Sequence, residues 1–248
     1  MGRMNILRNN LLLSASILLC SGNLFAFYSV DSIATSSAAT GSSVAWPHTI
    51  SREGTYLLVL TGQRAVADAS RPVTSITYGN YSLAKIREDD AVTANMTTDI
   101  WELKNPPIGT NTVTVTFAGN ILILAIGTSV SFFGVDLSSP VASSAGALQQ
   151  TDAASPSSVS ITTKQNDVFL VDVIYNQSAS ITAGANQVTL TDIDSVSASN
   201  DSVGVSTKLS TGSAKTDTMS WSYTANEVWA TSVVALKPAF GKKPFLRQ

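Results

Sequence analysis

The stretch from Val73 to Val135 constrains the fold more than any other part of the sequence. Short runs of β-branched and aromatic residues alternate there with polar residues, and Gly, Pro and Asn separate the runs. In T-V-T-V-T-F, for example, Val113, Val115 and Phe117 alternate with threonines, so one face of a strand is apolar and the other carries hydroxyls. This period of two, interrupted by turn residues, is typical of antiparallel strands joined by tight turns.

The rest of the chain shows the same kind of pattern. About a dozen strands are expected, with turn signals at the spacing of a β-sandwich. After the N-terminal segment, no pattern indicates a helix of ordinary length, and no repeat of fixed length points to a propeller or solenoid. The sequence therefore predicts an all-β protein, an antiparallel β-sandwich of the jelly-roll, concanavalin-like type over residues 49–239.

The N-terminus has the features of an export signal. Arg3 and Arg8 precede the apolar run 11–20, and a small residue, Ala26, stands at the expected cleavage point. We expect a signal peptide over residues 1–26 and a secreted or cell-surface protein. Lipid attachment at Cys20 and an uncleaved anchor are the alternatives, although the run is too short to span a bilayer as a permanent helix.

Two further segments flank the predicted sandwich. Residues 27–48 are rich in Ser, Ala and Thr and lack a period, which indicates a lead-in segment or linker. Residues 240–248 form a short basic tail. This tail is too small for a nucleic-acid footprint, and the net charge of the chain is only -2, so no nucleic-acid partner is expected.

Composition excludes several kinds of chemistry. Charged residues make up 13% of the chain, about half of the usual quarter. With one cysteine and one histidine, the chain can form neither an internal disulfide nor a Cys/His zinc site. A Ser-His-Asp triad would have to use His48, which precedes the first well-defined strand.

Four sequence runs suggest a family. The runs T-S-I-T-Y-G-N-Y-S-L, D-I-W-E-L-K-N-P-P-I-G-T-N-T-V-T-V-T-F, S-F-F-G-V-D and V-V-A-L-K-P-A together resemble a widespread jelly-roll module of secreted bacterial and phage-associated proteins. The resemblance covers Thr49 to Ala239 and rests on structural markers, so it implies a fold and no catalytic motif. Asn80 stands where members commonly have a second glycine, and Asn tolerates the positive φ of such a turn.

Aromatic residues beside polar ones are the candidates for glycan binding, because aromatic faces pack on sugar rings. Tyr78 and Tyr81 flank the Gly79-Asn80 turn and are expected at the surface. Trp101 and Glu102 lie on a strand from which Glu102 could project toward a ligand. The alternative is that Trp101 is a core residue and Glu102 an outward-facing strand residue.

Asp192 and Asp194 are the candidates for a metal site. They share one side of an extended segment, and their oxygens are the hard ligands that calcium prefers. The alternative is a pair of solvated loop acids. We expect no cofactor other than calcium.

These features together favour a non-enzymatic extracellular module, structural or adhesive, with glycans or other surface proteins as partners. A second hypothesis is a self-assembling subunit of a filament, coat or virion appendage, in which residues 27–51 add as a strand to a neighbour's sheet. A weaker third hypothesis is an atypical glycoside hydrolase or lyase that uses Glu102 and Glu227.

Overall fold

The computed structural model describes residues 28–239, except for residues 37–38, 66–70, 195–199, 213–214 and 225–226. The described residues form antiparallel strands, with a single 3-10 turn at Val92–Ala94 as their helical element. The predicted all-β, antiparallel sandwich is thereby confirmed. The predicted signal peptide, with Cys20, and the basic tail 240–248 lie outside the described residues.

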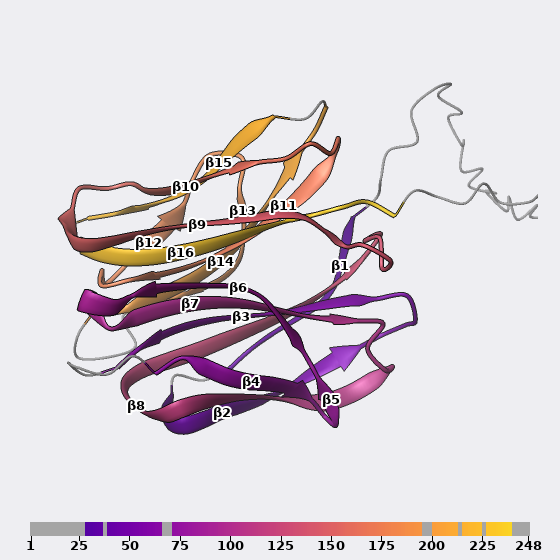
Figure 1. Ribbon diagram of the computed structural model, residues 1–248, viewed down its shortest axis with the longest axis horizontal. Coiled ribbons are helices and arrows are strands. Elements are labelled where there is room, and N and C mark those ends of the chain that lie inside the picture. Colours follow the sequence, from indigo (N-terminus) through magenta and orange to yellow (C-terminus); the bar gives the residue numbers. More distant parts are fainter. Residues whose placement is uncertain are drawn as a thin grey trace, which may run out of the picture.

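The strands of the first half are β1 (Ser29–Thr35), β2 (Ala39–Ile50), β3 (Tyr56–Arg64), β4 (Val73–Tyr78), β5 (Tyr81–Ser82), β6 (Ala84–Ala91), β7 (Met96–Lys104) and β8 (Gly109–Phe133). Those of the second half are β9 (Val141–Ala153), β10 (Ser157–Thr162), β11 (Val168–Asn176), β12 (Ile181–Ala183), β13 (Val188–Ile193), β14 (Ser202–Ser210), β15 (Thr216–Tyr223) and β16 (Glu227–Leu236). Figure 1 shows the first half below the second.

The two halves have the same strand order. In the first half, one layer runs β1-β8-β3-β7-β6 and the other β2-β8-β4-β5. In the second half, the layers run β9-β16-β11-β14-β13 and β10-β15-β12. The first four strands of each half alternate between two facing sheets, and two later ones, β6 and β7 or β13 and β14, pair within the inner one. This order is that of a jelly roll. The jelly-roll order is therefore present twice, in a repetition that no fixed-length sequence repeat revealed.

Strand β8 belongs to both layers of its half. In the second half the corresponding positions are occupied by two strands, β15 in one layer and β16 in the other. Strand β8 is 25 residues long, and its first part pairs with β4 up to Phe117 and with β2 up to Thr116, with further β2 partners at Ile121 and Ala125. From Leu124 onward it pairs with β3, and from Thr128 with β1. The register with β2 shifts between the partners Thr116 and Ile121, where β8 passes from one layer to the other. The eight-stranded sheet is consequently folded over on itself.

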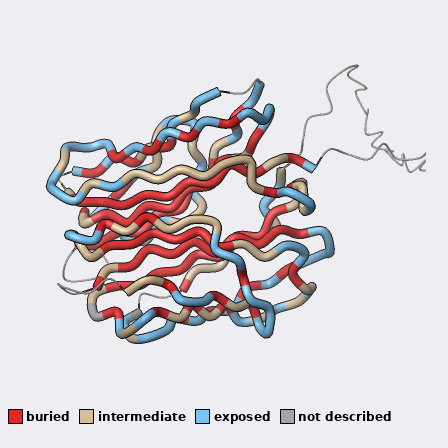
Figure 2. Tube along the Cα trace, viewed as in Figure 1, coloured by how far each residue is buried: buried red, intermediate tan, exposed pale blue. Residues whose placement is uncertain are grey.

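The molecule is a stack of four layers, which we name by their position (Figure 1). The outer N-terminal sheet contains β2, the first part of β8, β4 and β5, and the inner N-terminal sheet contains β1, the rest of β8, β3, β7 and β6. The inner C-terminal sheet is β9-β16-β11-β14-β13, and the outer C-terminal sheet is β10-β15-β12. Buried residues are concentrated in the strands of the inner sheets (Figure 2).

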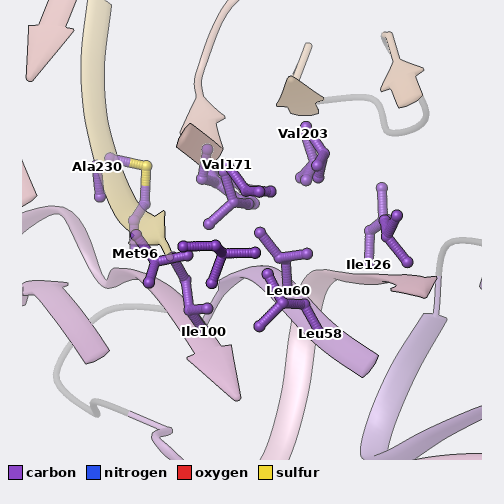
Figure 3. Packing of buried hydrophobic residues seen from close by; sticks show 14 of the residues in the cluster. Leu58, Leu60, Met96, Ile100, Ile126, Val171, Val203 and Ala230 are labelled. Atoms are coloured by element: carbon purple, nitrogen blue, oxygen red, sulfur yellow. The ribbon is translucent and has the colours of Figure 1, made fainter. Parts of the chain in front are cut away.

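The largest apolar cluster lies between the two inner sheets. Leu58, Leu60 and Ile100 of the inner N-terminal sheet meet Val171 and Val203 of the inner C-terminal sheet (Figure 3). Complete burial of an aliphatic side chain contributes about 1.5–3 kcal/mol, so this cluster unites the two halves. Separate clusters fill the space between each inner sheet and its outer sheet.

The segment expected as a lead-in or linker is part of the fold. β1 pairs with β8 from Ser29 opposite Phe133 to Thr35 opposite Thr128, and β2 pairs with the earlier part of β8. The Tyr28 ring stacks on Phe169 with the ring centroids 5.0 Å apart. β1 and β2 each pair with β8 within the chain, and the hypothesis that residues 27–51 add to a neighbour's sheet stays a prediction.

A polar contact also crosses between the halves, at Asp89 of β6. The Arg87 guanidinium donates two hydrogen bonds of 2.6 Å to the Asp89 carboxylate, and Ser232 Oγ of β16 donates another of 2.5 Å. Ser232 also shares a 2.8 Å hydrogen bond with Thr98 of β7. A Cβ at Gly146 of β9 would lie 2.0 Å from the Asp89 oxygens, so this contact needs a residue without a side chain there.

We expect Gly146→Ala to lower the free energy of unfolding by about 1–3 kcal/mol, because the added methyl displaces the Asp89 carboxylate from Ser232. Urea denaturation followed by tryptophan fluorescence measures this change. Gly119→Ala is the matched control, since its Cβ would meet only the flexible Arg71 side chain, at 3.1 Å. Equal effects of the two substitutions would contradict the packing argument.

Candidate functional site

The outer N-terminal sheet presents an uncharged array of hydroxyls to solvent. Because Val113, Val115 and Phe117 of β8 point into the core, the threonines between them point outward. The neighbouring strands extend the array, since Ser43 lies opposite Thr116 and Thr77 opposite Thr114. The outward hydroxyl residues are Ser43, Thr49, Ser75, Thr77, Thr110, Thr112, Thr114 and Thr116. β2, the first part of β8 and β4 contain no Asp, Glu, Lys or Arg.

The outer C-terminal sheet carries a second array of the same kind. Inward-facing residues such as Val159 and Met219 alternate with outward hydroxyls, which pair across the strands. Ser160 and Thr218 are 3.2 Å apart, and Thr162 and Thr216 are 2.7 Å apart. The outward hydroxyl residues are Ser158, Ser160, Thr162, Thr182, Thr216, Thr218, Ser220 and Ser222.

We call these two arrays the hydroxyl faces. Neighbouring side chains on them are about 4.5–5.5 Å apart across strands and about 6.6 Å apart along a strand. Each hydroxyl can both donate and accept a hydrogen bond. The faces cover the two opposite ends of the four-layer stack (Figure 1). The alternation in β8 predicts its outward threonines, and the repeated T-x-T and S-x-S spacing was the signal by which the faces could have been identified as a site.

The two predicted surface tyrosines have different environments. Tyr81 is 52% exposed, whereas Tyr78 is fully buried. The Tyr78 hydroxyl donates to the carbonyl oxygens of Gly109 at 2.8 Å and His48 at 3.2 Å. Tyr78 continues the inward face of β4 begun by Ile76, so its predicted surface position is corrected. Tyr81 alone of this pair is available to a ligand.

Trp101 and Glu102 point to opposite sides of β7. The Trp101 ring is buried between the two layers of the N-terminal half, with Lys85 Nζ 5.0 Å from the ring centroid. Glu102 accepts a 2.5 Å hydrogen bond from the Tyr56 hydroxyl. The structure therefore does not assemble the four predicted residues into one platform. Glu102 and Glu227, the proposed hydrolase pair, belong to different halves of the chain.

Asp192 and Asp194 do lie together, at the edge of the inner C-terminal sheet. Burial and the neighbouring Asp194 raise the pKa of Asp192 to about 7. Asp194 Oδ1 accepts a 3.2 Å hydrogen bond from the Ile181 amide. Calcium takes six to eight oxygen ligands, and the described residues contain no group of three or more Asp, Glu, His or Cys placed to hold a metal. The calcium site remains a prediction that would need backbone or water ligands.

Strand β6 contains a bulge that gathers three ionisable groups. The register with β7 shifts between Lys85 and Arg87, so one extra residue brings Lys85 and Glu88 onto the same face of the strand. There they form an ion pair, and Lys85 Nζ lies 3.4 Å from Asp99 Oδ1. Asp99 is fully buried. Burial raises its pKa to about 7, although Lys85 opposes that rise.

His48 belongs to a continuous hydrogen-bond chain. Trp46 Nε1 donates to Ser129 Oγ at 2.9 Å, and Ser129 Oγ lies 2.9 Å from His48 Nδ1. On the other side, His48 Nε2 lies 3.1 Å from Ser131 Oγ, which donates to Asp31 at 3.0 Å. An indole N–H can only donate and a carboxylate can only accept, so a neutral His48 with its proton on Nε2 satisfies every link.

This chain differs from a catalytic triad. In a triad the carboxylate orients the histidine and the histidine contacts one serine. Here Asp31 contacts Ser131, and His48 lies between two serines and is 1% exposed. The chain instead ties β1 and β2 to β8. Burial lowers the pKa of His48 to about 4, with Asp31 acting in the opposite direction.

No family model, curated protein or solved structure matches this chain. The resemblance to a secreted jelly-roll module therefore remains a prediction, and the jelly-roll order itself stands on the observed strand pairing. In the part of the chain that the structure describes, no helix is long and apolar enough to cross a membrane.

Acidification should weaken the fold through His48. Between pH 6.5 and 4 the unfolded chain binds a proton at His48 while the folded chain does not, so stability falls as pH falls. We expect wild type to lose on the order of 2 kcal/mol relative to His48→Gln between pH 7 and pH 4.5. Urea denaturation of both proteins at the two pH values measures this difference.

Wild type must be compared with His48→Gln because other groups change the stability in the opposite direction when the pH falls. Burial raises the pKa of Asp172 and of Asp192 to about 7, so these carboxyl groups stabilise the fold as pH falls from 7 to 4. Both proteins contain these groups, and their contributions cancel in the difference. If the free energy of unfolding changed equally with pH in wild type and in His48→Gln, His48 would not be held neutral in the folded protein.

Proposed function

We propose that this protein is a non-enzymatic, extracellular structural or adhesive module that binds neutral glycans through its hydroxyl faces. The observation that carries the proposal is the pair of outward hydroxyl arrays on the two outer sheets. The predicted signal peptide supports an extracellular location, and the low content of charged residues supports an uncharged partner.

Neutral polysaccharides fit these faces chemically. Their surfaces also consist of hydroxyls, so the two surfaces can exchange hydrogen bonds without burying an unpaired charge. One such hydrogen bond contributes only about 0.5–1.5 kcal/mol net. Useful affinity therefore requires many bonds at once, which favours an extended polymer over a short oligosaccharide. Two faces on one rigid body would also allow a single molecule to bridge two polymer surfaces.

We expect Thr114→Lys together with Thr218→Lys to reduce binding to insoluble neutral polysaccharides, such as cellulose and chitin, in a cosedimentation assay. Each change removes a hydroxyl and places a charge in the contact, which should lower affinity by about two- to tenfold per position. Thr189→Lys is the matched control, because Thr189 is exposed on the edge strand β13, away from both faces. Binding that is absent in wild type, or unchanged in the double variant, would refute the proposal.

Self-assembly is the second candidate, and the position of the hydroxyl faces favours it. Two flat faces at opposite ends of the stack allow head-to-tail contacts, which produce an open filament when the rotation between copies does not close. Light scattering coupled to size-exclusion chromatography separates the two candidates: a monomer supports glycan binding, whereas large assemblies support the filament. Deletion of residues 27–51 cannot serve as the test, because it removes β1 and β2 from the sheets.

A further inference from the structure

We propose that Lys85 and Asp99 condense to form an amide bond that joins β6 to β7 covalently. The proposal does not depend on glycan binding, since both residues lie inside the N-terminal half and away from the hydroxyl faces. It concerns a chain whose single cysteine, Cys20, falls within the predicted signal peptide and leaves no thiol for a disulfide.

The bulge in β6 creates the required geometry. Without the extra residue, Lys85 and Glu88 would point to opposite faces of the strand, because side chains alternate. With it, the Lys85 amine lies 3.4 Å from Asp99 Oδ1 and in contact with the Glu88 carboxylate. The Val73 carbonyl oxygen accepts a further 3.3 Å hydrogen bond from the same amine and fixes its position.

The surroundings of Asp99 favour the reaction over a simple ion pair. The carboxyl group is 0% exposed, and the polar contact of its Oδ1 is the 3.4 Å approach of the Lys85 amine itself. Its other oxygen accepts only a long, 3.4 Å hydrogen bond from Thr61. Burial raises the pKa of Asp99 and favours its neutral carboxylic acid, the form that condenses with an amine. For Lys85, burial acts against the charged form, but the Glu88 and Asp99 carboxylates outweigh it and raise the pKa, so the ammonium must first give up a proton.

Glu88 can move the protons that the reaction requires. It first accepts a proton from the Lys85 ammonium, which frees the nitrogen to attack the Asp99 carboxyl carbon. It then returns that proton to the departing hydroxyl, which leaves as water, and takes up the second proton that the nitrogen releases. One C–N bond forms and one C–O bond breaks, with no oxidant, reductant or external reagent. The Lys85 side chain is 33% exposed, so the released water has a path to solvent.

The intact mass of the purified protein tests the proposal directly. We expect the folded wild-type chain to be lighter than its sequence by one water molecule. Lys85→Arg retains the positive charge but cannot form the amide, so its mass should equal that of its sequence. Lys104→Arg is the matched control: Lys104 lies on β7, 3.9 Å from Glu102, and its replacement should leave the loss of water intact.

Two further measurements locate the bond. Trypsin should release residues 65–87 joined to residues 88–104 as a branched peptide, and amine labelling should count two amino termini in it. Glu88→Gln should slow the loss of water without unfolding the protein, as judged by circular dichroism. A wild-type mass equal to that of the sequence, or a loss of water that persists in Lys85→Arg, would overturn the proposal and leave an ordinary ion pair.

Discussion

The apolar contact between the two inner sheets is the constraint on which the rest of the structure depends. Each inner sheet is covered on both faces, by its own outer sheet and by the other half of the molecule. Its strands therefore contain long buried runs, as in β3, where eight consecutive residues are buried. The outer sheets are covered on one face only and show strict alternation, as in β10. The hydroxyl faces are thus a consequence of the position of the outer sheets in the stack.

Two carboxyl groups buried inside this stack, Asp172 and Asp99, differ in their hydrogen-bond partners. Asp172 of β11 accepts hydrogen bonds from the Ser206 amide at 3.1 Å, from the Ser206 hydroxyl at 2.6 Å and from Trp221 Nε1 at 2.9 Å. These three donors favour its ionised form, while complete burial opposes it. Asp99 has no comparable set of donors. This difference between two equally buried carboxyl groups sets Asp99 apart as a reactive group.

Much of the fold could be predicted from the sequence, because alternation reports directly on one-sided burial. The inward valines of T-V-T-V-T-F are an example. The pairing of distant strands was not predictable, since β1 and β8 are joined by contacts such as Ser29 with Phe133 that leave no local signal. For the same reason the second jelly roll was missed. Tyr78 was misplaced because a turn next to a residue does not decide which face its side chain occupies. The cluster at Lys85 depends on a bulge, and no residue in the sequence identifies a one-residue register shift.

The Tyr28 hydroxyl donates a 2.7 Å hydrogen bond to the carbonyl oxygen of Leu236, so the first described residue lies beside the end of the last strand. Both ends of the folded body therefore leave from one side of the stack (Figure 1). A molecule held at a surface by either end would stand with its layers edge-on to that surface. Both hydroxyl faces would then point sideways, toward neighbouring molecules and polymers, and neither would be covered by the attachment.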